Sequence, residues 1–138
     1  MTVESSATMR MSPHPLLAGL LLFTCTAAAA NGAKMDAFFR SLDPITRLVQ
    51  VCDAAVMERT SHPKDGATDR AAIDGIRRTH VHGDVAEGDG GAFRRRGEWY
   101  EFAYRCVVTP DHMRVTDLSI DIKRQVPHAE WEANDLYP

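Results

Sequence analysis

The stretch YEFAYRCVV, residues 100–108, is the part of the sequence that decides the fold. Side chains on a β-strand alternate between its two faces, so this spacing gathers the bulky apolar residues on one face. That row consists of Tyr100, Phe102, Tyr104, Cys106 and Val108. A cysteine in such a row is compatible with a buried thiol, a disulfide, a metal ligand or a nucleophile, and the remaining sequence must distinguish among these.

A second cysteine, Cys52, lies in the middle of a predicted amphipathic helix. Asp43 followed by Pro44 is a typical helix start, because aspartate accepts hydrogen bonds from the first free N–H groups and proline suits the first turn. In the run ITRLVQVCDAAVMERT that follows, the apolar residues recur at helical spacing and share one face. The pattern predicts a helix of about four turns that ends near Ser61.

The last third of the sequence predicts an antiparallel sheet. Residues 92–95 and 98–108 form a hairpin around Arg96-Gly97, and a proline turn leads to a further strand over 113–123. We therefore expect an α+β fold in which one long amphipathic helix packs on a three- to four-stranded antiparallel sheet. Each element buries the face that carries its cysteine, so their packing predicts a helix–sheet disulfide between Cys52 and Cys106.

The segment between the helix and this hairpin is patterned less clearly. Residues 70–76 weakly favour a strand, and one short strand near 79–86 is expected to end in a turn made by the following glycines and aspartates. After Pro127, the sequence predicts a short amphipathic turn or helix that covers the sheet with Trp131.

The N-terminus has the three-part build of a secretory signal peptide. A basic residue precedes the apolar run LLAGLLLF, residues 16–23, and small residues follow it. The run is shorter than the ~20 apolar residues that span a membrane. We expect residues 1–30 to be a signal peptide, cleaved after Ala30 or Ala33. Residues 31–138 would then form a single small domain in the periplasm or outside the cell, with no transmembrane segment.

Composition agrees with an exported globular domain. Cleavage removes Cys25 and leaves two cysteines, the usual setting for a structural disulfide. The chain is 44% hydrophobic and 25% charged, which is ordinary for a folded domain. Its formal net charge of −3 provides no electrostatic case for a nucleic-acid partner.

The hairpin sequence RRRGEWY is the first candidate binding site. Guanidinium groups beside aromatic rings are suited to a phosphate, a sugar acid or an anionic headgroup. The alternative is a solvated hairpin tip whose arginines pair with carboxylates. Strand alternation separates the middle arginine from its two neighbours. The ligand-binding hypothesis assigns Arg94, Arg95, Arg96, Trp99 and Tyr100.

The motif HVHGD is the second candidate. On a strand, His80, His82 and Asp84 share a face, which is a plausible arrangement for metal ligands. The motif is similar to the H-x-H-x-D-H run of metallo-β-lactamase-like hydrolases, although Val85 stands where the last histidine would be. The alternative is a polar strand face near a sheet edge. No G-x-S-x-G nucleophile motif is present in the sequence, and no cofactor is expected.

Several segments together resemble one protein family. LDPITRLVQVCDAAVME, GGAFRRRGEWYEFAYRC, TPDHMRV and a terminal P-x-x-E-W-E resemble the bacterial domain-of-unknown-function family 930. The resemblance extends from Leu42 to Leu136. It implies an exported, single-domain protein whose activity is unassigned.

These observations favour an exported, non-enzymatic envelope module that binds an envelope protein or an anionic ligand. Two alternatives remain open. One is a small metal-dependent, hydrolase-like enzyme that uses His80, His82 and Asp84, and the other is a secreted enzyme inhibitor.

Overall fold

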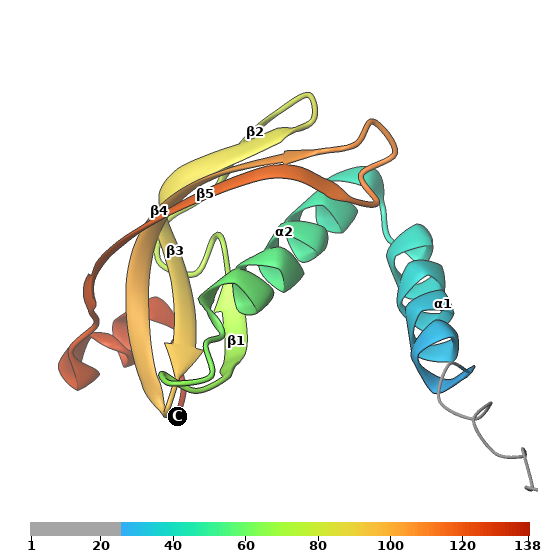
Figure 1. Cartoon of the computed structure of the whole chain (residues 1–138). Coiled ribbons are helices and arrows are strands. Elements are labelled where there is room, and N and C mark those ends of the chain that lie inside the picture. The colour runs from blue at the N-terminus through green and yellow to red at the C-terminus, as the bar shows by residue number, and fades with distance from the viewer. Residues whose placement is uncertain (1–25) are drawn as a thin grey trace, which may run out of the picture.

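The computed structural model describes residues 26–138, which form two helices and a five-stranded antiparallel sheet (Figure 1). The elements are α1 (Thr26–Ser41), α2 (Pro44–Thr60), β1 (Thr68–Ala72), β2 (His80–His82), β3 (Val85–Arg95), β4 (Glu98–Val108), β5 (Val115–Gln125) and the 3-10 turns η1 (His128–Glu130) and η2 (Glu132–Asn134). The apolar run of the predicted signal peptide lies outside the described residues. The expected cleavage position after Ala30 falls within α1.

The α+β class and the antiparallel sheet agree with the sequence analysis, but one helix and three to four strands were too few. The additional helix, α1, lies in an alanine-rich stretch that lacks a clear amphipathic stripe. The additional strand, β2, has only three residues and pairs with β3 at the side of the main order β1-β3-β4-β5. Neither described helix is long and apolar enough to cross a membrane.

Helix α2 lies across one face of the curved sheet, and its start is the predicted one (Figure 1). The Asp43 carboxylate accepts a hydrogen bond from the Thr46 N–H at 3.1 Å, and Pro44 is the first helical residue. The main core lies between this helix and the strands. Its largest completely buried side chains are Leu48, Val56, Ile73, Phe93 and Phe102.

The predicted disulfide joins α2 to β4. Cys52 and Cys106 are both completely buried, and their sulfur atoms form a disulfide bond. The two Cα atoms are 6.2 Å apart. The bond therefore links the helix to the middle of the sheet, from the two apolar rows in which the cysteines were found.

Arg47 attaches α1 to the rest of the fold, a role that the sequence pattern did not indicate. Its guanidinium donates to the carbonyl oxygens of Phe39 (2.9 Å), Arg40 (3.2 Å) and Leu42 (2.9 Å), around the end of α1. It also donates to the Asp111 carbonyl oxygen at 3.0 Å, in the turn between β4 and β5. One side chain thus occupies the free carbonyls at a helix end and ties them to the sheet.

The turn expected in the glycine-rich stretch after residue 87 does not form. Strand β3 runs through it without turning back, and the pairing with β4 shifts register between Gly88 and Gly91. The stretch is a bulge whose glycines allow close approach of another segment. The Gly90 carbonyl oxygen accepts hydrogen bonds from the N–H groups of Ile76 (2.7 Å) and Arg77 (3.2 Å).

We expect Gly90→Ala to destabilise the protein by about 2–3 kcal/mol, the upper part of the usual range for overpacking. An added Cβ would lie 2.5 Å from the Arg77 nitrogen and 2.8 Å from its Cα, so the backbone itself would have to move. Urea unfolding followed by circular dichroism measures the change. Gly32→Ala, in a protein expressed from residue 31, is the control, because its Cβ would meet nothing within 4 Å. Equal midpoints for both variants would contradict the close approach.

The C-terminal segment covers one end of the other face of the sheet, as expected for Trp131. There a small second core consists of Ala92, Trp99, Val126, Trp131 and Leu136. The indole N–H of Trp131 donates to the Val126 carbonyl oxygen at 3.0 Å. The Trp99 indole N–H likewise donates to a backbone carbonyl oxygen of this segment, that of Tyr137, at 3.0 Å. The sheet is therefore buried on two sides near the β3–β4 hairpin.

Candidate functional site

The candidate ligand residues at the β3–β4 hairpin do not form one surface. Arg94 and Trp99 are paired across the two strands and lie on the face covered by the C-terminal segment. Arg94 makes a two-pronged ion pair with Asp69, at 2.6 and 3.0 Å, and Trp99 is only 5% exposed. Both donate to the Tyr137 carbonyl oxygen, at 3.3 and 3.0 Å. These two side chains therefore hold the C-terminal segment in place.

Arg95 and Tyr100 lie on the opposite face, beside α2. The Arg95 guanidinium is 5.4 Å from the centre of the Tyr100 ring and 5.6 Å from that of Phe93. It donates to the Thr60 carbonyl oxygen at 2.9 Å, at the end of α2. Arg96, at the tip of the hairpin, points elsewhere and donates to the Lys64 carbonyl oxygen at 2.5 Å. Only Arg95 of the three arginines faces the hollow described next.

An open groove runs between the C-terminal half of α2 and the edge strand β5. It contains two adjoining hollows of about 490 and 460 Å³ that share Arg59 and Leu118. The first is lined by Ala55, Glu58, Arg59, Val115, Thr116, Asp117 and Leu118. The second is lined by Arg59, Thr60, His62, Asp65, Arg95, Leu118, Ser119, Ile120 and Ile122. We call the second hollow the arginine groove.

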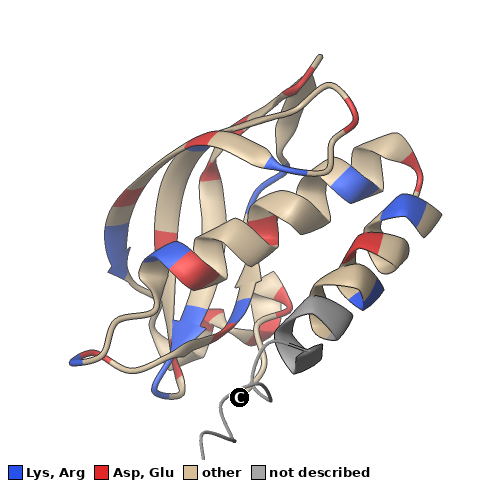
Figure 2. Cartoon of the chain, turned by 45° about the vertical axis from the view of Figure 1, so that its right-hand side comes forward, with Lys and Arg blue, Asp and Glu red and all other residues tan. Residues whose placement is uncertain are grey.

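The arginine groove combines cationic and apolar walls. Within residues 26–138, no carboxylate lies within 4.0 Å of the Arg59 or Arg95 guanidinium. By contrast, Arg77, Arg94 and Arg124 each form an ion pair with at least one carboxylate. Asp65 is the only acidic residue of the lining, and it lies 3.7 Å from the ring of His62. Ile122 is 49% exposed on the opposite wall. Figure 2 shows basic positions mixed with acidic ones around this end of α2.

The structure does not assemble the candidate metal ligands. His80 and His82 are exposed on β2, but the Asp84 carboxylate is 3.2 Å from Nε2 of His112. The other ring nitrogen of His112 is 2.7 Å from the Pro44 carbonyl oxygen, so this buried histidine bridges the start of α2 and the β2–β3 turn. Among the residues described, no group of three or more His, Cys, Asp or Glu side chains is placed to hold a metal ion.

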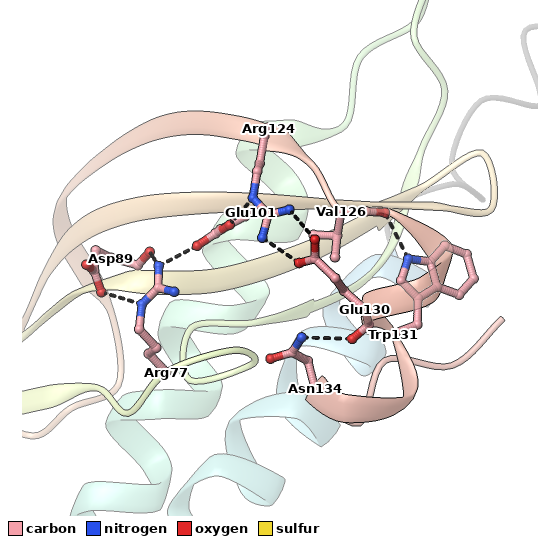
Figure 3. A network of polar contacts seen from close by, with 8 residues as sticks. All are labelled: Arg77, Asp89, Glu101, Arg124, Val126, Glu130, Trp131 and Asn134. Carbon is pink, nitrogen blue, oxygen red and sulfur yellow. Dashed lines mark hydrogen bonds and ion pairs between the residues drawn. The ribbon is translucent and has the colours of Figure 1, made fainter.

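A chain of ion pairs on the other face of the sheet surrounds Glu101, which is 5% exposed (Figure 3). Its carboxylate accepts from Arg77 and, at 2.7 Å, from Nε of Arg124. Arg77 also donates to Asp89 at 2.9 Å, and Arg124 to Glu130 at 2.7 and 3.1 Å. Hydrogen bonding to Arg124 keeps the pKa of the Glu130 carboxyl below its ordinary value. Each of these charged side chains contacts one of opposite charge, and the Arg124–Glu130 pair connects β5 to the C-terminal turns.

Asp53 is a second buried carboxyl, on the sheet-facing side of α2. It accepts a hydrogen bond from the Ile73 N–H at 2.7 Å, and the Gln50 side-chain amide lies 3.3 Å away. Burial raises the pKa of Asp53 from 3.8 to about 7; the Ile73 hydrogen bond opposes this rise, and the nearby charge of Asp74 adds to it. Asp53 lines neither hollow of the groove, so we expect its ionisation to affect the stability of the fold.

Sequence reasoning missed Arg59 and the groove itself. Strand alternation places Leu118, Ile120 and Ile122 on one face of the strand predicted over 113–123, which was a usable signal for an apolar wall. The sequence did not indicate that β5 would be an edge strand next to the end of α2. The position of the Arg95 side chain on the apolar face of the hairpin follows from strand alternation alone.

Comparison with known proteins places the chain in a family but supplies no activity. The profile of the family described as Domain of Unknown Function (DUF930) matches residues 39–136. That span begins in the last part of α1 and includes every strand. Neither the curated proteins nor the solved structures give a match.

Proposed function

This chain belongs to the DUF930 family of domains of unknown function, and from that premise we propose that it is an exported, non-enzymatic module of the cell envelope. Its role in this proposal is to bind an anionic ligand or partner. The binding site is the arginine groove between α2 and β5.

One observation carries the proposal: two guanidinium groups that have no carboxylate partner among residues 26–138 line a hollow with an apolar wall. In residues 26–138 the charges of Arg59 and Arg95 are met only by carbonyl oxygens and aromatic rings. A ligand with a negative group beside an apolar part would therefore satisfy both kinds of wall.

Export is supported by the sequence rather than by the fold. The apolar run at residues 16–23 and the small residues after it have the pattern of a signal peptide. The bond between Cys52 and Cys106 is the kind of cross-link that persists in an oxidising compartment. Both features favour a periplasmic or secreted location.

The metal-dependent alternative has weaker support, because Asp84 contacts His112 and no group of three potential ligands is present among residues 26–138. An enzyme inhibitor would also be a partner-binding module. This inhibitor alternative is tested by the glutamine variants of Arg59 and Arg95 described below, with inhibition of a hydrolase as the readout.

The test uses two dyes that differ by one charge, 8-anilinonaphthalene-1-sulfonate and its uncharged analogue N-phenyl-1-naphthylamine. Replacing Arg59 and Arg95 together by glutamine should weaken binding of the sulfonate about tenfold or more, since each charge-assisted contact is worth about 1.5–3 kcal/mol. Binding of the uncharged dye should change little. Added salt should weaken only the sulfonate.

The matched control is Arg78→Gln, which removes an exposed arginine that does not line the groove. Circular dichroism and the urea midpoint verify that each variant is folded. Equal sulfonate affinity in the double variant and the control would refute the arginine groove as an anion site.

A further inference from the structure

The arginine groove is bordered by backbone as well as by side chains. Strand β5 pairs with β4 on one side, and within residues 26–138 no strand lies on its other side. On that free side, the Leu118 carbonyl oxygen is met by a side chain, the Arg59 guanidinium at 3.5 Å. The edge of the sheet is therefore one rim of the groove.

The register shows which β5 residues present their backbone to the groove. Leu118, Ile120 and Ile122 lie opposite Cys106, Tyr104 and Phe102, with regular pairing between them. In an antiparallel pair, alternate residues direct both N–H and C=O away from the neighbouring strand. Because the Leu118 carbonyl is directed toward Arg59, the same holds for Ile120 and Ile122. The side chains of these three residues also line the groove.

We propose that the partner of this groove is an extended polypeptide segment that adds as a further strand to the free edge of β5. The proposal rests on the function proposed above and names the class of partner. A strand of about six residues is long enough to follow residues 117–122, at ~3.3 Å per residue. Its backbone would pair with Leu118, Ile120 and Ile122.

Strand alternation determines the composition of that segment. Side chains at every second position face α2, as the β5 side chains do. An acidic residue there can reach Arg59 and Arg95, and apolar residues there can cover Ile120 and Ile122. The partner is therefore a segment in which every second residue, on the side that faces the groove, is apolar or acidic.

The edge backbone favours a polypeptide over a lipid anion. An acyl chain seated on β5 would remove the outward N–H groups of Leu118 and Ile120, and the Ile120 carbonyl oxygen, from water without replacing their hydrogen bonds. Burying polar groups without hydrogen-bond partners is unfavourable. An added strand satisfies these groups, as in other cases of peptide recognition at sheet edges.

The probe is a capped seven-residue peptide with threonine at odd positions and two valines and one glutamate at even positions. Added to the full mature protein, it should slow hydrogen exchange of the Leu118 and Ile120 amides at least tenfold. The Ser119 amide, which already faces β4, should be unchanged. A lysine in place of the glutamate should weaken binding about tenfold, and replacing Arg59 and Arg95 together by glutamine should remove that difference.

Backbone methylation separates strand addition from side-chain contact. Two peptides are methylated on alternate amides, one set at the odd positions and the other at the even positions. One of them should lose binding and the other should retain it, because only one set of amides faces β5. Equal binding by both would overturn strand addition.

Two further results would also overturn it and leave the proposed function standing. The sulfonate dye binds through Arg59 and Arg95 but the peptide protects no β5 amide, which would favour a lipid anion. Alternatively, the free protein sediments as a dimer with Leu118 and Ile120 already protected, which would make a second copy the occupant. Failure of the native protein to bind either the sulfonate dye or the peptide would refute the arginine groove as a binding site.

Discussion

Removing the Cys52–Cys106 bond should lower the free energy of unfolding by about 4 kcal/mol, the largest effect expected for this protein. The bond closes a loop with a sequence separation of 54 residues, and its loss gives the unfolded chain back the corresponding freedom. Total stability of a domain of this size is only about 5–15 kcal/mol. We expect the cross-link to account for a large share of it.

The measurement compares urea unfolding of the oxidised protein with and without dithiothreitol. The double variant Cys52→Ala, Cys106→Ala is the control, because the reductant has nothing to cleave there and should leave its midpoint unchanged. Cys106→Ser should be worse than the double alanine variant, since it leaves a hydroxyl in a completely buried position. A reductant that shifts neither protein would contradict the cross-link.

The second large effect is a fall in stability as the pH rises through the range in which Asp53 ionises. Burial raises its pKa to about 7 in the folded protein, from the ordinary 3.8 of an unfolded chain. Between these values the folded state holds a proton that the unfolded state has lost. Stability contributed by this group is therefore complete below about pH 4 and is lost by about pH 7. The full loss has an upper limit of about 4 kcal/mol.

Asp53→Asn isolates this contribution, because the amide does not ionise and its oxygen can still accept from the Ile73 N–H. Subtracting the variant's stability from that of the native protein should give a difference that falls between about pH 4 and pH 7 and is flat above. At pH 8 the variant should be the more stable protein. Asp74→Asn, at an exposed neighbouring position, is the control and should only move the curve slightly. A flat difference curve would show that Asp53 is ionised at no cost.

Local patterns predicted the parts of the fold in which one face is buried along a whole element. The start of α2 at Asp43-Pro44, the hairpin around Gly97 and the pairing of Cys52 with Cys106 all follow from such patterns. The bulge in β3 did not, because a glycine needed for a turn and a glycine needed for a close approach look the same in sequence. Only the contact of Gly90 with Arg77 distinguishes them.

The candidate site was predicted less well, because a site depends on which elements become neighbours. Arg94, Arg95 and Arg96 are consecutive, but strand alternation and the hairpin tip send them to three different places. Trp99 was expected to face a ligand, and the C-terminal segment buries it instead. The residue that we propose to face the ligand is instead Arg59, which lines the groove beside β5, the last strand in the sheet order.

The anchoring of Tyr137 by Arg94 and Trp99 has a consequence for the order in which the chain can mature. A polypeptide is synthesised, and crosses a membrane, from its N-terminus, so α2 and β4 emerge long before residue 137. The two thiols can meet and be oxidised while the Trp99 indole still has no acceptor and the second core is open to water. In a chain exported as we propose, covalent closure can therefore precede the last step of packing, and a chain stalled before its final dozen residues would be cross-linked while its tryptophan is still exposed to chaperones.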